Sequence, residues 1–162
     1  MTILVQMPPE HFNEFAATAS ASHAADNVTS GRWLAHEAEQ LARSELSRLL
    51  PTQIATPDHH LYEIKLETAG PVLGYVWFGA ISRGSVKVAF VFQLFVYPQY
   101  RRQGHGRAAL ARVEELAAGL GLAAVALNVF GSNSGAQALY RSLGYAVTSL
   151  SMQKELSSCP VA

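Results

Sequence analysis

Two shortages in the sequence, of cysteine and of basic charge in excess, each exclude a class of protein. Cys159 is the only cysteine among 162 residues, so no internal disulfide can form and a disulfide-built secreted scaffold is excluded. Lys and Arg together number 12, as do Asp and Glu, which gives a formal net charge of zero. Proteins that bind nucleic acid or anionic membranes normally carry a basic excess. We therefore expect neither a nucleic acid nor a membrane as a partner.

The sequence also lacks a segment that would direct it into or through a membrane. Its first ten residues have no basic region followed by an apolar run, so they do not resemble a signal peptide. The most apolar stretch, 116–130, is interrupted by Gly119, Gly121 and Asn128. It is shorter than the roughly 18 residues that a membrane helix needs. We expect a cytoplasmic protein.

Length and composition favour one folded domain. Domains average roughly 150 residues, and this chain has 162. Apolar residues make up 49% and charged residues 15%, against about 25% charged in an average protein. General disorder requires low hydrophobicity and high net charge, so it is excluded. We expect a single domain over 1–162, with residues 155–162 as a flexible C-terminal tail.

Hydrophobic periodicity and turn residues predict an α/β fold. The expected order is β-α-α-β-β-β-α-β-α-β, with an antiparallel meander followed by a parallel βαβ crossover. Helices are expected on both faces of one mixed sheet. We expect strands at 3–7, 61–66, 71–81, 86–97, 123–130 and 145–152, and helices at 10–28, 34–50, 104–120 and 134–143. The apolar strand at 123–130 is of the buried type.

The segment between the longest strand and the third helix has the features of an anion site. It reads Tyr97-Pro-Gln-Tyr-Arg-Arg-Gln-Gly-His-Gly-Arg107. Gly104 and Gly106 allow close approach of the backbone to a ligand. They precede a helix whose first amides are unpaired and partly positive, a geometry that binds phosphate or pyrophosphate. Side chains that can add bidentate contacts to phosphate are Arg101, Arg102 and Arg107.

Two better-known phosphate motifs do not fit this segment. The third glycine of a Rossmann G-x-G-x-x-G would fall on Ala109. A P-loop needs G-x-x-x-x-G-K-S/T, which the sequence does not contain. Taken alone, the segment is also compatible with a glycine loop that only turns a strand into a helix.

A second motif, from Asn133 to Tyr145, reads N-S-G-A-Q-A-L-Y-R-S-L-G-Y. The two motifs together resemble the GNAT superfamily of acetyl-CoA-dependent N-acyltransferases, closely so over residues 86–154. The first half is similar to an uncharacterised bacterial subgroup of that superfamily, through D-N-V at 26–28, G-R-W at 31–33, L-L-P at 49–51 and T-P-D-H-H at 56–60. The resemblance implies one N-acetyltransferase domain over nearly the whole chain and brings no substrate with it.

The resemblance implies acetyl-CoA as co-substrate. In the family, backbone groups of the strand before the glycine loop pair with the pantetheine amides as an added strand would. This strand and residues 126–129 would splay apart to leave a slot for the cofactor. Matched by position, the pantetheine strand is Leu94, Phe95 and Val96, and the pyrophosphate amides are those of Gln103, Gly104, His105, Gly106, Arg107 and Ala108.

The second motif contributes two residues to the site that the resemblance implies. Asn133 resembles the residue that hydrogen-bonds the pantetheine arm, and capping of the following helix is an alternative or additional role. Tyr140 matches the tyrosine near the thioester sulfur, where its phenol would protonate or hydrogen-bond the leaving thiolate. An unperturbed pKa of ~10 keeps the phenol protonated at neutral pH. Packing beside Leu139 and Leu143 is the alternative for Tyr140.

The sequence departs from the family where a carboxylate base is often found. Those positions hold Gln93 and Asn128, and neither side chain can take a proton. A water chain or another side chain could serve as the base, and no base is needed if the amine arrives neutral. His59 and His60 are the candidate side chains, because imidazole titrates near neutrality. Adjacent residues of a strand point to opposite faces, so at most one of the two histidines can face the cleft. A solvated loop end is the alternative for both, and His105 is expected near the phosphates without a catalytic role.

Aromatic residues are candidates for the acceptor pocket. Trp33, Trp77 and Tyr62 could line it, although core packing is favoured for Trp77 because it lies in a continuous apolar strand. We expect the connection 27–33 to form a mobile wall opposite the cofactor. A small polyamine, an aminoglycoside-like drug, an amino acid and a protein N-terminus are all compatible with the sequence as acceptor.

We expect the protein to transfer an acetyl group from acetyl-CoA to a primary amine by direct attack in a ternary complex. An acyl-cysteine route is not expected because no cysteine lies near the motifs. A metal is not expected either, because no His, Cys and Asp residues have metal-site spacing. The alternative is a non-catalytic module that binds or senses acyl-CoA. Monomer and homodimer are both left open.

Overall fold

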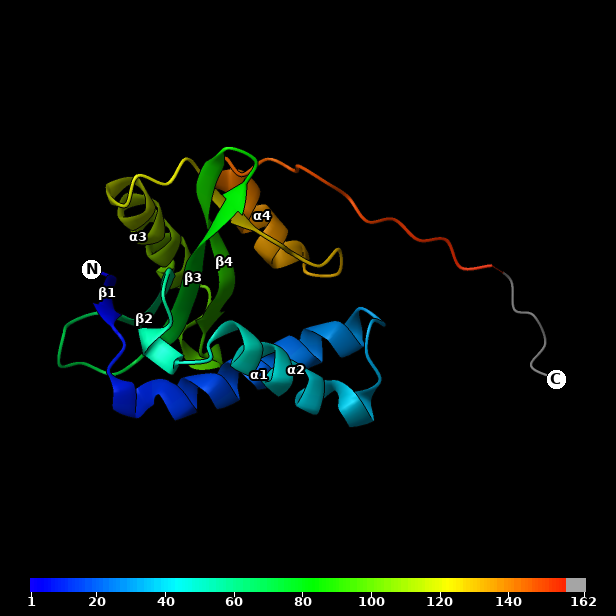
Figure 1. The fold of residues 1–162 in the computed structure, drawn as a ribbon, viewed down its shortest axis with the longest axis horizontal. Coiled ribbons are helices and arrows are strands. Elements are labelled where there is room, and N and C mark those ends of the chain that lie inside the picture. The colour runs from blue at the N-terminus through cyan, green and yellow to red at the C-terminus, as the bar shows by residue number, and fades with distance from the viewer. Residues whose placement is uncertain (157–162) are drawn as a thin grey trace.

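The structure is a computed structural model, and it describes residues 1–156 (Figure 1). Its strands are β1 (Ile3–Gln6), β2 (His59–Lys65), β3 (Gly74–Arg83), β4 (Val86–Val96) and β5 (Val125–Leu127). Its α-helices are α1 (Phe12–Thr29), α2 (Ala35–Leu49), α3 (His105–Gly119) and α4 (Ser134–Ser142). Short 3₁₀ turns are η1 (Pro9–His11), η2 (Gln53–Ala55) and η3 (Pro98–Tyr100).

The five strands form one mixed sheet in the order β1-β2-β3-β4-β5. The first four strands pair antiparallel with their neighbours, and β5 pairs parallel with β4 after the α3 crossover. This arrangement confirms the predicted α/β class, with its antiparallel meander and its parallel βαβ unit. The register between β3 and β4 shifts at Trp77/Phe78, which marks a bulge in the long central pair.

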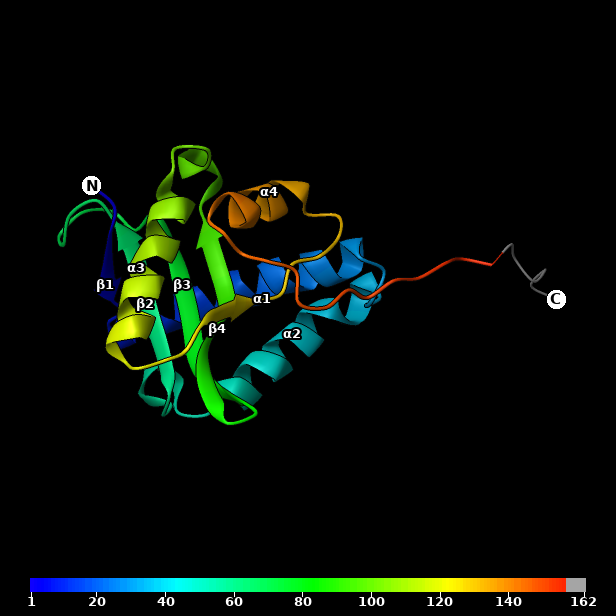
Figure 2. The same ribbon diagram turned by 90° about the horizontal axis from the view of Figure 1, so that it is seen from above.

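Helices cover both faces of the sheet, as predicted (Figures 1 and 2). The core under α1 and α2 contains Phe15 and Leu46, packed against Tyr75 and Trp77 of β3. The core under α3 contains Leu110 and Val113, packed against Val76, Phe78 and Val91 of the sheet, and residues of α4 border it. Neighbouring residues of β3 therefore supply opposite cores, which explains why this central strand reads as a continuous apolar run.

The amphipathic pattern of α2 decides how it packs. Its buried residues, Ala38, Ala42 and Leu46, recur at every fourth position and so lie along one face of the helix. Pro51 follows directly after the helix and its C-cap residue, as the sequence predicts. Gly121 and Gly144 stand just after α3 and α4 with φ of +73° and +91°, which is the left-handed conformation of a helix C-terminus.

Two expectations about strands were wrong. The strand expected at 123–130 extends only over Val125–Leu127, and residues 145–152, expected as a last strand, belong to no strand. Instead, Tyr145 stays packed beside Tyr140, and residues 146–156 run as an extended segment away from the domain (Figures 1 and 2). The physical reason is that a strand needs hydrogen bonds to a neighbour. This segment leaves α4 without meeting a free edge of its own sheet.

Part of the predicted tail cannot be compared with the structure. Residues 155 and 156 are exposed and outside any helix or strand, while residues 157–162, including Cys159, lie outside the described residues. Within residues 1–156, no helix combines the length and the apolar character needed to cross a membrane.

Candidate active site

The sheet opens between β4 and β5. The two strands pair from Ala89↔Val125 to Val91↔Leu127, and β5 ends there while β4 continues to Val96. On its other side, β4 stays paired with β3 up to Gly74↔Val96. Among the described residues, no strand pairs with the β5-facing edge of residues 92–96. The sequence-predicted residues Leu94, Phe95 and Val96 lie on this half-buried edge, where an extended amide ligand can pair with the backbone.

The opening leads to the N-terminal end of α3 (Figure 2). Gly104 caps this helix in the left-handed conformation, with φ of +85°, and its carbonyl accepts the first helical hydrogen bond from the Ala108 amide. Within the described residues, the amides of His105, Gly106 and Arg107 have no backbone acceptor. Three adjacent donors at a helix N-terminus form a site for an anion.

Two of the predicted phosphate arginines make contacts within the protein. The Arg101 Nε donates to the Val96 carbonyl at 2.8 Å, and its guanidinium lies 5.5 Å from the centre of the Phe95 ring. Arg107 donates to the Ser142 Oγ at 2.6 Å and so joins α3 to the end of α4. These contacts hold the end of β4 and the first turn of α3 in place.

Other predicted residues of the glycine loop make local contacts. The Gln103 side chain donates to the Gln99 carbonyl at 3.1 Å. The Nδ1 of His105 is 3.0 Å from the Thr2 hydroxyl, which ties the start of α3 to the N-terminal segment. Arg102 has a positive φ of 62°, and its guanidinium lies beside Gly135 in the first turn of α4. The loop therefore lies between the N-termini of two helices.

Asn133 caps α4. Its Oδ1 accepts a hydrogen bond from the Ala136 amide at 3.1 Å, which is the geometry of an N-cap. The cap uses only the oxygen of the side chain, so the NH₂ group is compatible with a second role toward the pantetheine arm. The two alternatives from the sequence can therefore hold together.

Tyr140 lies on α4 at the border of the α3 core. Its ring is half-buried against that core and 5.9 Å from the ring of Tyr145. Burial raises the pKa of the Tyr140 phenol above its ordinary value, so the hydroxyl stays protonated at neutral pH. Within the described residues this hydroxyl has no hydrogen-bond partner, whereas the Tyr145 hydroxyl donates to Glu114 at 3.0 Å. Tyr140 combines core packing with an uncommitted proton donor.

The two candidate histidines point to opposite faces of β2, as strand geometry requires. The Nδ1 of His59 accepts a hydrogen bond from the Trp77 indole at 2.9 Å, and burial lowers the pKa of His59, with a further lowering by His60. The neutral ring then carries its proton on Nε2 and has no basic nitrogen left. His60 stacks on Phe78 at 4.9 Å on the α3 side. Both are half-buried strand residues rather than a solvated loop end.

The three candidate aromatic residues are not brought together. Trp77 is 4% exposed in the α1/α2 core and stacks on Phe92 at 4.7 Å. Tyr62 lies on the opposite face of the sheet, stacked against Phe78. Trp33 is half-buried between α1 and α2, with its ring 5.2 Å from His23. The three residues therefore do not line one pocket together.

The connection between α1 and α2 reaches toward the open end of β5. The Arg32 guanidinium lies 5.9 Å from the centre of the Phe130 ring. Asn27 is fully buried, and its carbonyl accepts from the amides of Arg32 and Trp33 at 2.9 and 3.3 Å. The connection thus adjoins the segment that begins with Asn128, and it is anchored by hydrogen bonds.

Gln93 and Asn128 both lie where β4 and β5 part. Asn128 directly follows the last paired residue of β5, and Gln93 comes two residues after Val91. Gln93 faces the α1/α2 side of the sheet, because it pairs with Trp77 of that core. These are the positions where the sequence lacks a carboxylate, and neither amide side chain can act as a base.

Asp26 near the end of α1 is a carboxylate that the sequence interpretation did not assign. It follows Phe15 and Ala19, which pack on the sheet, at helical spacings of 11 and 7 residues, but its side chain is exposed at this end of the helix. Asp26 comes seven residues after Ala19, which corresponds to about 10 Å along the helix axis. Partial desolvation of the carboxylate raises the pKa of Asp26, against the opposing effect of His23.

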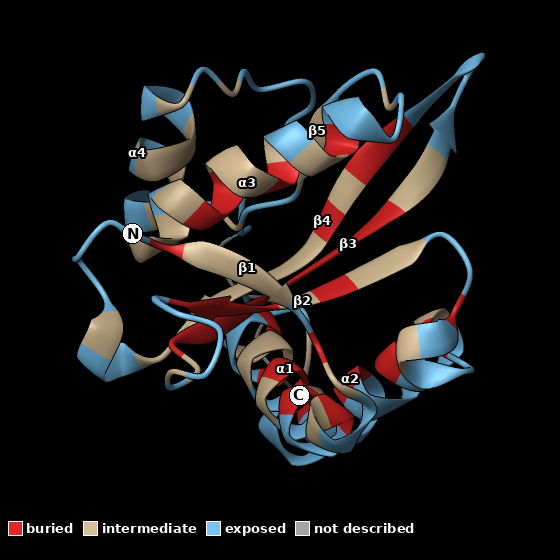
Figure 3. Ribbon diagram, turned by 90° about the vertical axis from the view of Figure 1, so that its left-hand side faces the viewer, coloured by how far each residue is buried: buried red, intermediate tan, exposed pale blue. Residues whose placement is uncertain are grey.

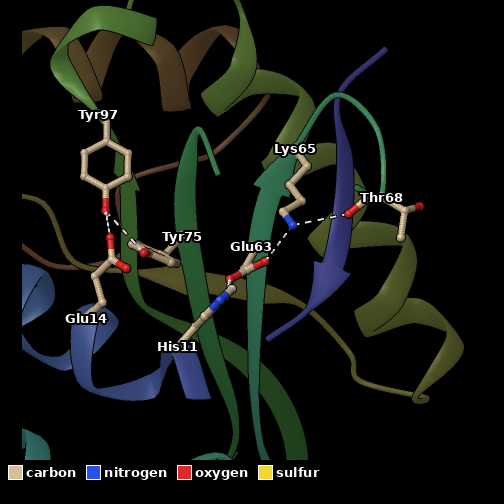
Figure 4. Close-up of polar contacts among 7 residues, drawn as sticks. All are labelled: His11, Glu14, Glu63, Lys65, Thr68, Tyr75 and Tyr97. Atoms are coloured by element: carbon tan, nitrogen blue, oxygen red, sulfur yellow. Dashed lines mark hydrogen bonds and ion pairs between the residues drawn. The ribbon is translucent and has the colours of Figure 1, made fainter. Parts of the chain in front are cut away.

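A buried polar layer on the α1/α2 side also escaped the sequence interpretation (Figure 4). The Glu63 carboxylate, 1% exposed, is paired with His11 and, at 3.1 Å, with Lys65. Tyr97, which follows β4, donates to Glu14 of α1 and lies 3.2 Å from the Tyr75 hydroxyl. The only signal in the sequence was a carboxylate at an inward-facing strand position. These contacts join β2, β3 and the end of β4 to the first helices.

The described residues contain no group of three His, Cys, Asp or Glu side chains that could hold a metal ion. The arrangement instead combines a free strand edge, unpaired helix amides, a protonated phenol and an adjoining helix connection. Together these can bind an extended molecule that carries amides at one end and phosphates at the other. The phenol can supply a proton to a leaving group.

A model of the acetyltransferase (GNAT) family matches residues 26–145. The chain is 32% identical over 157 residues to the uncharacterised N-acetyltransferase YycN of Bacillus subtilis, covering 96% of this chain and 100% of that protein. It is 41% identical over 66 residues to the [ribosomal protein bS18]-alanine N-acetyltransferase of Escherichia coli, covering 41% of this chain and 45% of that protein.

Solved structures agree with the fold. The crystal structure of YycN from Bacillus subtilis superposes with a TM-score of 0.90 at 30% identity, covering 98% of this chain and all of that one. The structure of AAC(6')-Iy in complex with a CoA-containing bisubstrate analogue has a TM-score of 0.63 at 16% identity, covering 98% of this chain and 99% of that one. The second likeness concerns the fold alone.

We predict that Asn133→Asp separates capping from cofactor binding. Aspartate keeps the oxygen that accepts from Ala136, so the melting temperature should stay near that of the wild type. Replacing the NH₂ donor by a carboxylate should weaken acetyl-CoA binding by at least about tenfold, or 1.4 kcal/mol. Calorimetric titration and thermal melts measure both. An unchanged dissociation constant would mean that Asn133 is only a helix cap.

Proposed function

Because the chain belongs to the acetyltransferase (GNAT) family and is an N-acetyltransferase, we propose that it transfers the acetyl group of acetyl-CoA to a primary amine by direct attack in a ternary complex. Acetyl-CoA is the co-substrate of the family. The observation that carries the proposal is the opening between β4 and β5, which leads to the unpaired amides of α3. The identity of the acceptor amine and the catalytic roles of individual residues are likewise proposals.

Acetyl-CoA fits the two halves of this opening by its chemistry. The free edge of residues 94–96 would pair with the amides of the pantetheine arm, as an added strand does. The free amides at the start of α3 would bind the pyrophosphate, with Arg102 beside them, whereas the Ala108 amide, predicted for the same role, is already bound to the Gly104 carbonyl. Arg101 and Arg107 would support this site by holding the end of β4 and the start of α3.

Tyr140 would act as the proton donor in the transfer. The amine nitrogen forms the new bond to the acetyl carbon, the carbon–sulfur bond breaks, and the phenol of Tyr140 gives its proton to the thiolate. Its lack of a hydrogen-bond partner within the described residues supports this role, and its raised pKa means only that the phenol is protonated at neutral pH. Positioning of the two substrates and polarisation of the thioester carbonyl by free amides would supply the rest of the rate acceleration.

Tyr140→Phe tests this role without disturbing the packing. Phenylalanine keeps the ring against the α3 core and removes only the hydroxyl, so stability should change little. The value of kcat should fall by about 10²- to 10⁴-fold, with acetyl-CoA affinity nearly unchanged. Thiol release in the presence of a good acceptor measures the rate. Tyr145→Phe is the control, because the Tyr145 hydroxyl is already bound to Glu114. Equal rates for wild type and Tyr140→Phe would reduce Tyr140 to a packing residue.

Asp26 would take the proton of the attacking amine, or would hold the amine as an ion pair. It is exposed near the end of α1, just before the connection whose Arg32 lies over the Phe130 ring. Its raised pKa makes it a stronger base than an ordinary aspartate. In this role it would replace the carboxylates missing at Gln93 and Asn128.

Asp26→Asn should lower kcat/KM by about a hundredfold and change the pH profile. The carboxylate acts as a base only when it is deprotonated, so wild-type activity should fall as pH drops through its raised pKa. The variant should lose this acidic limb. Asp58→Asn, a change of the same atoms at an exposed site beside Lys87, should leave the rate and the profile unchanged. The same acidic limb in wild type and Asp26→Asn would contradict the role.

A panel of acceptors distinguishes an enzyme from a module that only binds acyl-CoA. An N-terminal alanine peptide and an aminoglycoside are the first two compounds, because two similar proteins act on or bind such molecules by name. Thiol release that depends on one acceptor supports the proposal. Tight acetyl-CoA binding with no release for any amine supports the non-catalytic alternative. The cytoplasmic location and the lack of nucleic-acid and membrane partners stay predictions from composition.

A further inference from the structure

Arg32, in the connection between α1 and α2, carries a charge that the protein does not neutralise. The residue is exposed, and among residues 1–156 its guanidinium forms no ion pair with a carboxylate. It lies instead 5.9 Å from the centre of the Phe130 ring. An arginine held over an aromatic face can still offer its N–H groups to an anion. The proposed cofactor site does not use this residue.

The backbone that carries Arg32 is fixed to the end of α1. The Asn27 carbonyl accepts from the amides of Arg32 and Trp33 at 2.9 and 3.3 Å. The same carbonyl also accepts from the Ser30 hydroxyl at 3.0 Å, and Asn27 itself is buried. These bonds form a turn with a defined shape, which sets the position from which Arg32 reaches Phe130.

The ring beneath Arg32 belongs to the mouth of the opening between β4 and β5. Phe130 comes two residues after Asn128, where the strands part, and two residues span at most about 7 Å. The Phe130 carbonyl accepts from the Asn133 amide at 3.0 Å and from the Gln137 side chain at 3.1 Å, so the ring is also held by α4. Neither β5 nor α4 contains a buried residue, so a solute can reach this side of the domain (Figure 3).

We propose that Arg32 binds a carboxylate of the acceptor, and that the acceptor is therefore a small amino acid, a primary amine that carries a free carboxylate. The inference rests on the proposed acetyl transfer and names the class of its acceptor. A guanidinium can hold a carboxylate through two parallel N–H···O bonds, which orients as well as binds it. With acetyl-CoA along the edge of β4, the amine would attack where β4 and β5 part, and its carboxylate would extend toward Arg32.

The connection offers both charges that an amino acid needs. Asp26 precedes Asn27, whose carbonyl holds the Arg32 amide, so the backbones of Asp26 and Arg32 lie close together. Their side chains form no ion pair with each other within the described residues, and the guanidinium lies over Phe130. An ammonium near Asp26 and a carboxylate at Arg32 would place a zwitterion across the mouth with both charges matched.

This arrangement separates the four acceptor classes that the sequence leaves open. A polyamine and an aminoglycoside carry several positive groups and no negative group, so Arg32 would repel them. In a protein N-terminus, a peptide bond replaces the carboxylate beside the amine. The amino acid is the class that always carries a carboxylate near the reacting nitrogen.

Matched pairs of acceptors test the inference. Each amino acid is compared with its own amide, in which a neutral group of nearly the same shape replaces the carboxylate. The set includes amino acids with one to five carbons between the amine and the carboxylate. For the best of them, the wild type should favour the acid over the amide by at least about tenfold in kcat/KM. The amine of the amide is less basic and more often unprotonated, so amine basicity works against this preference and cannot create it.

Three variants assign the preference to one guanidinium. Arg32→Gln should bring the ratio of acid to amide close to one, with acetyl-CoA affinity unchanged. Arg32→Lys keeps the charge and loses the two-pronged geometry, so it should keep only part of the preference. Arg48→Gln is the matched control, because Arg48 is an exposed arginine about 20 Å away from the start of α2 along the helix axis. This control should keep the wild-type ratio.

Binding to the enzyme saturated with CoA gives a readout that needs no turnover. Calorimetric titrations should show the same preference for the acid in the wild type and its loss in Arg32→Gln, with circular dichroism as the check of folding. A wild type that neither acetylates nor binds any acid better than its amide overturns the inference, as does a preference that persists in folded Arg32→Gln. A binding preference that depends on Arg32, without thiol release for any amine, would support the carboxylate site and contradict the proposed acetyl transfer.

Discussion

β4 continues for five residues after its pairing with β5 stops, and the site depends on this difference in length. The opening needs one rigid wall, and β3 supplies it. A Cβ at Gly74 would overlap the Phe95 carbonyl oxygen and lie 2.9 Å from the Cα of Val96, so β3 and β4 approach more closely there than any side chain allows. Only glycine at position 74 permits this close approach, and the approach holds residues 94–96 in place from the β3 side.

The elements around the opening are joined by a few side-chain contacts. Arg101 holds the Val96 carbonyl, and Arg107 holds Ser142, so the two arginines fix α3 relative to β4 and to α4. On the other side of the sheet, Tyr97 connects the end of β4 to Glu14 of α1 (Figure 4). These contacts explain how short motifs far apart in sequence can form one site for an extended cofactor.

The order of elements and the anion loop could be predicted because both are local properties. Helical spacing, the positive-φ glycines after α3 and α4, and the loop around Gly104 are all written in neighbouring residues. The absence of the strand expected at 145–152 could not be predicted, because a strand pattern does not reveal which edge it joins. Likewise, the contacts of Arg101 and the partial desolvation of Asp26 depend on packing between distant elements.

Hydrogen exchange with and without acetyl-CoA tests the central claim most directly. If the opening between β4 and β5 binds the co-substrate, amides at residues 92–96 and 104–108 should gain protection together, because one ligand covers both segments. Residues 59–65 of β2, on the far side of β3, should be unaffected. Protection that appears elsewhere in the chain, with both of these segments unchanged, would contradict the account.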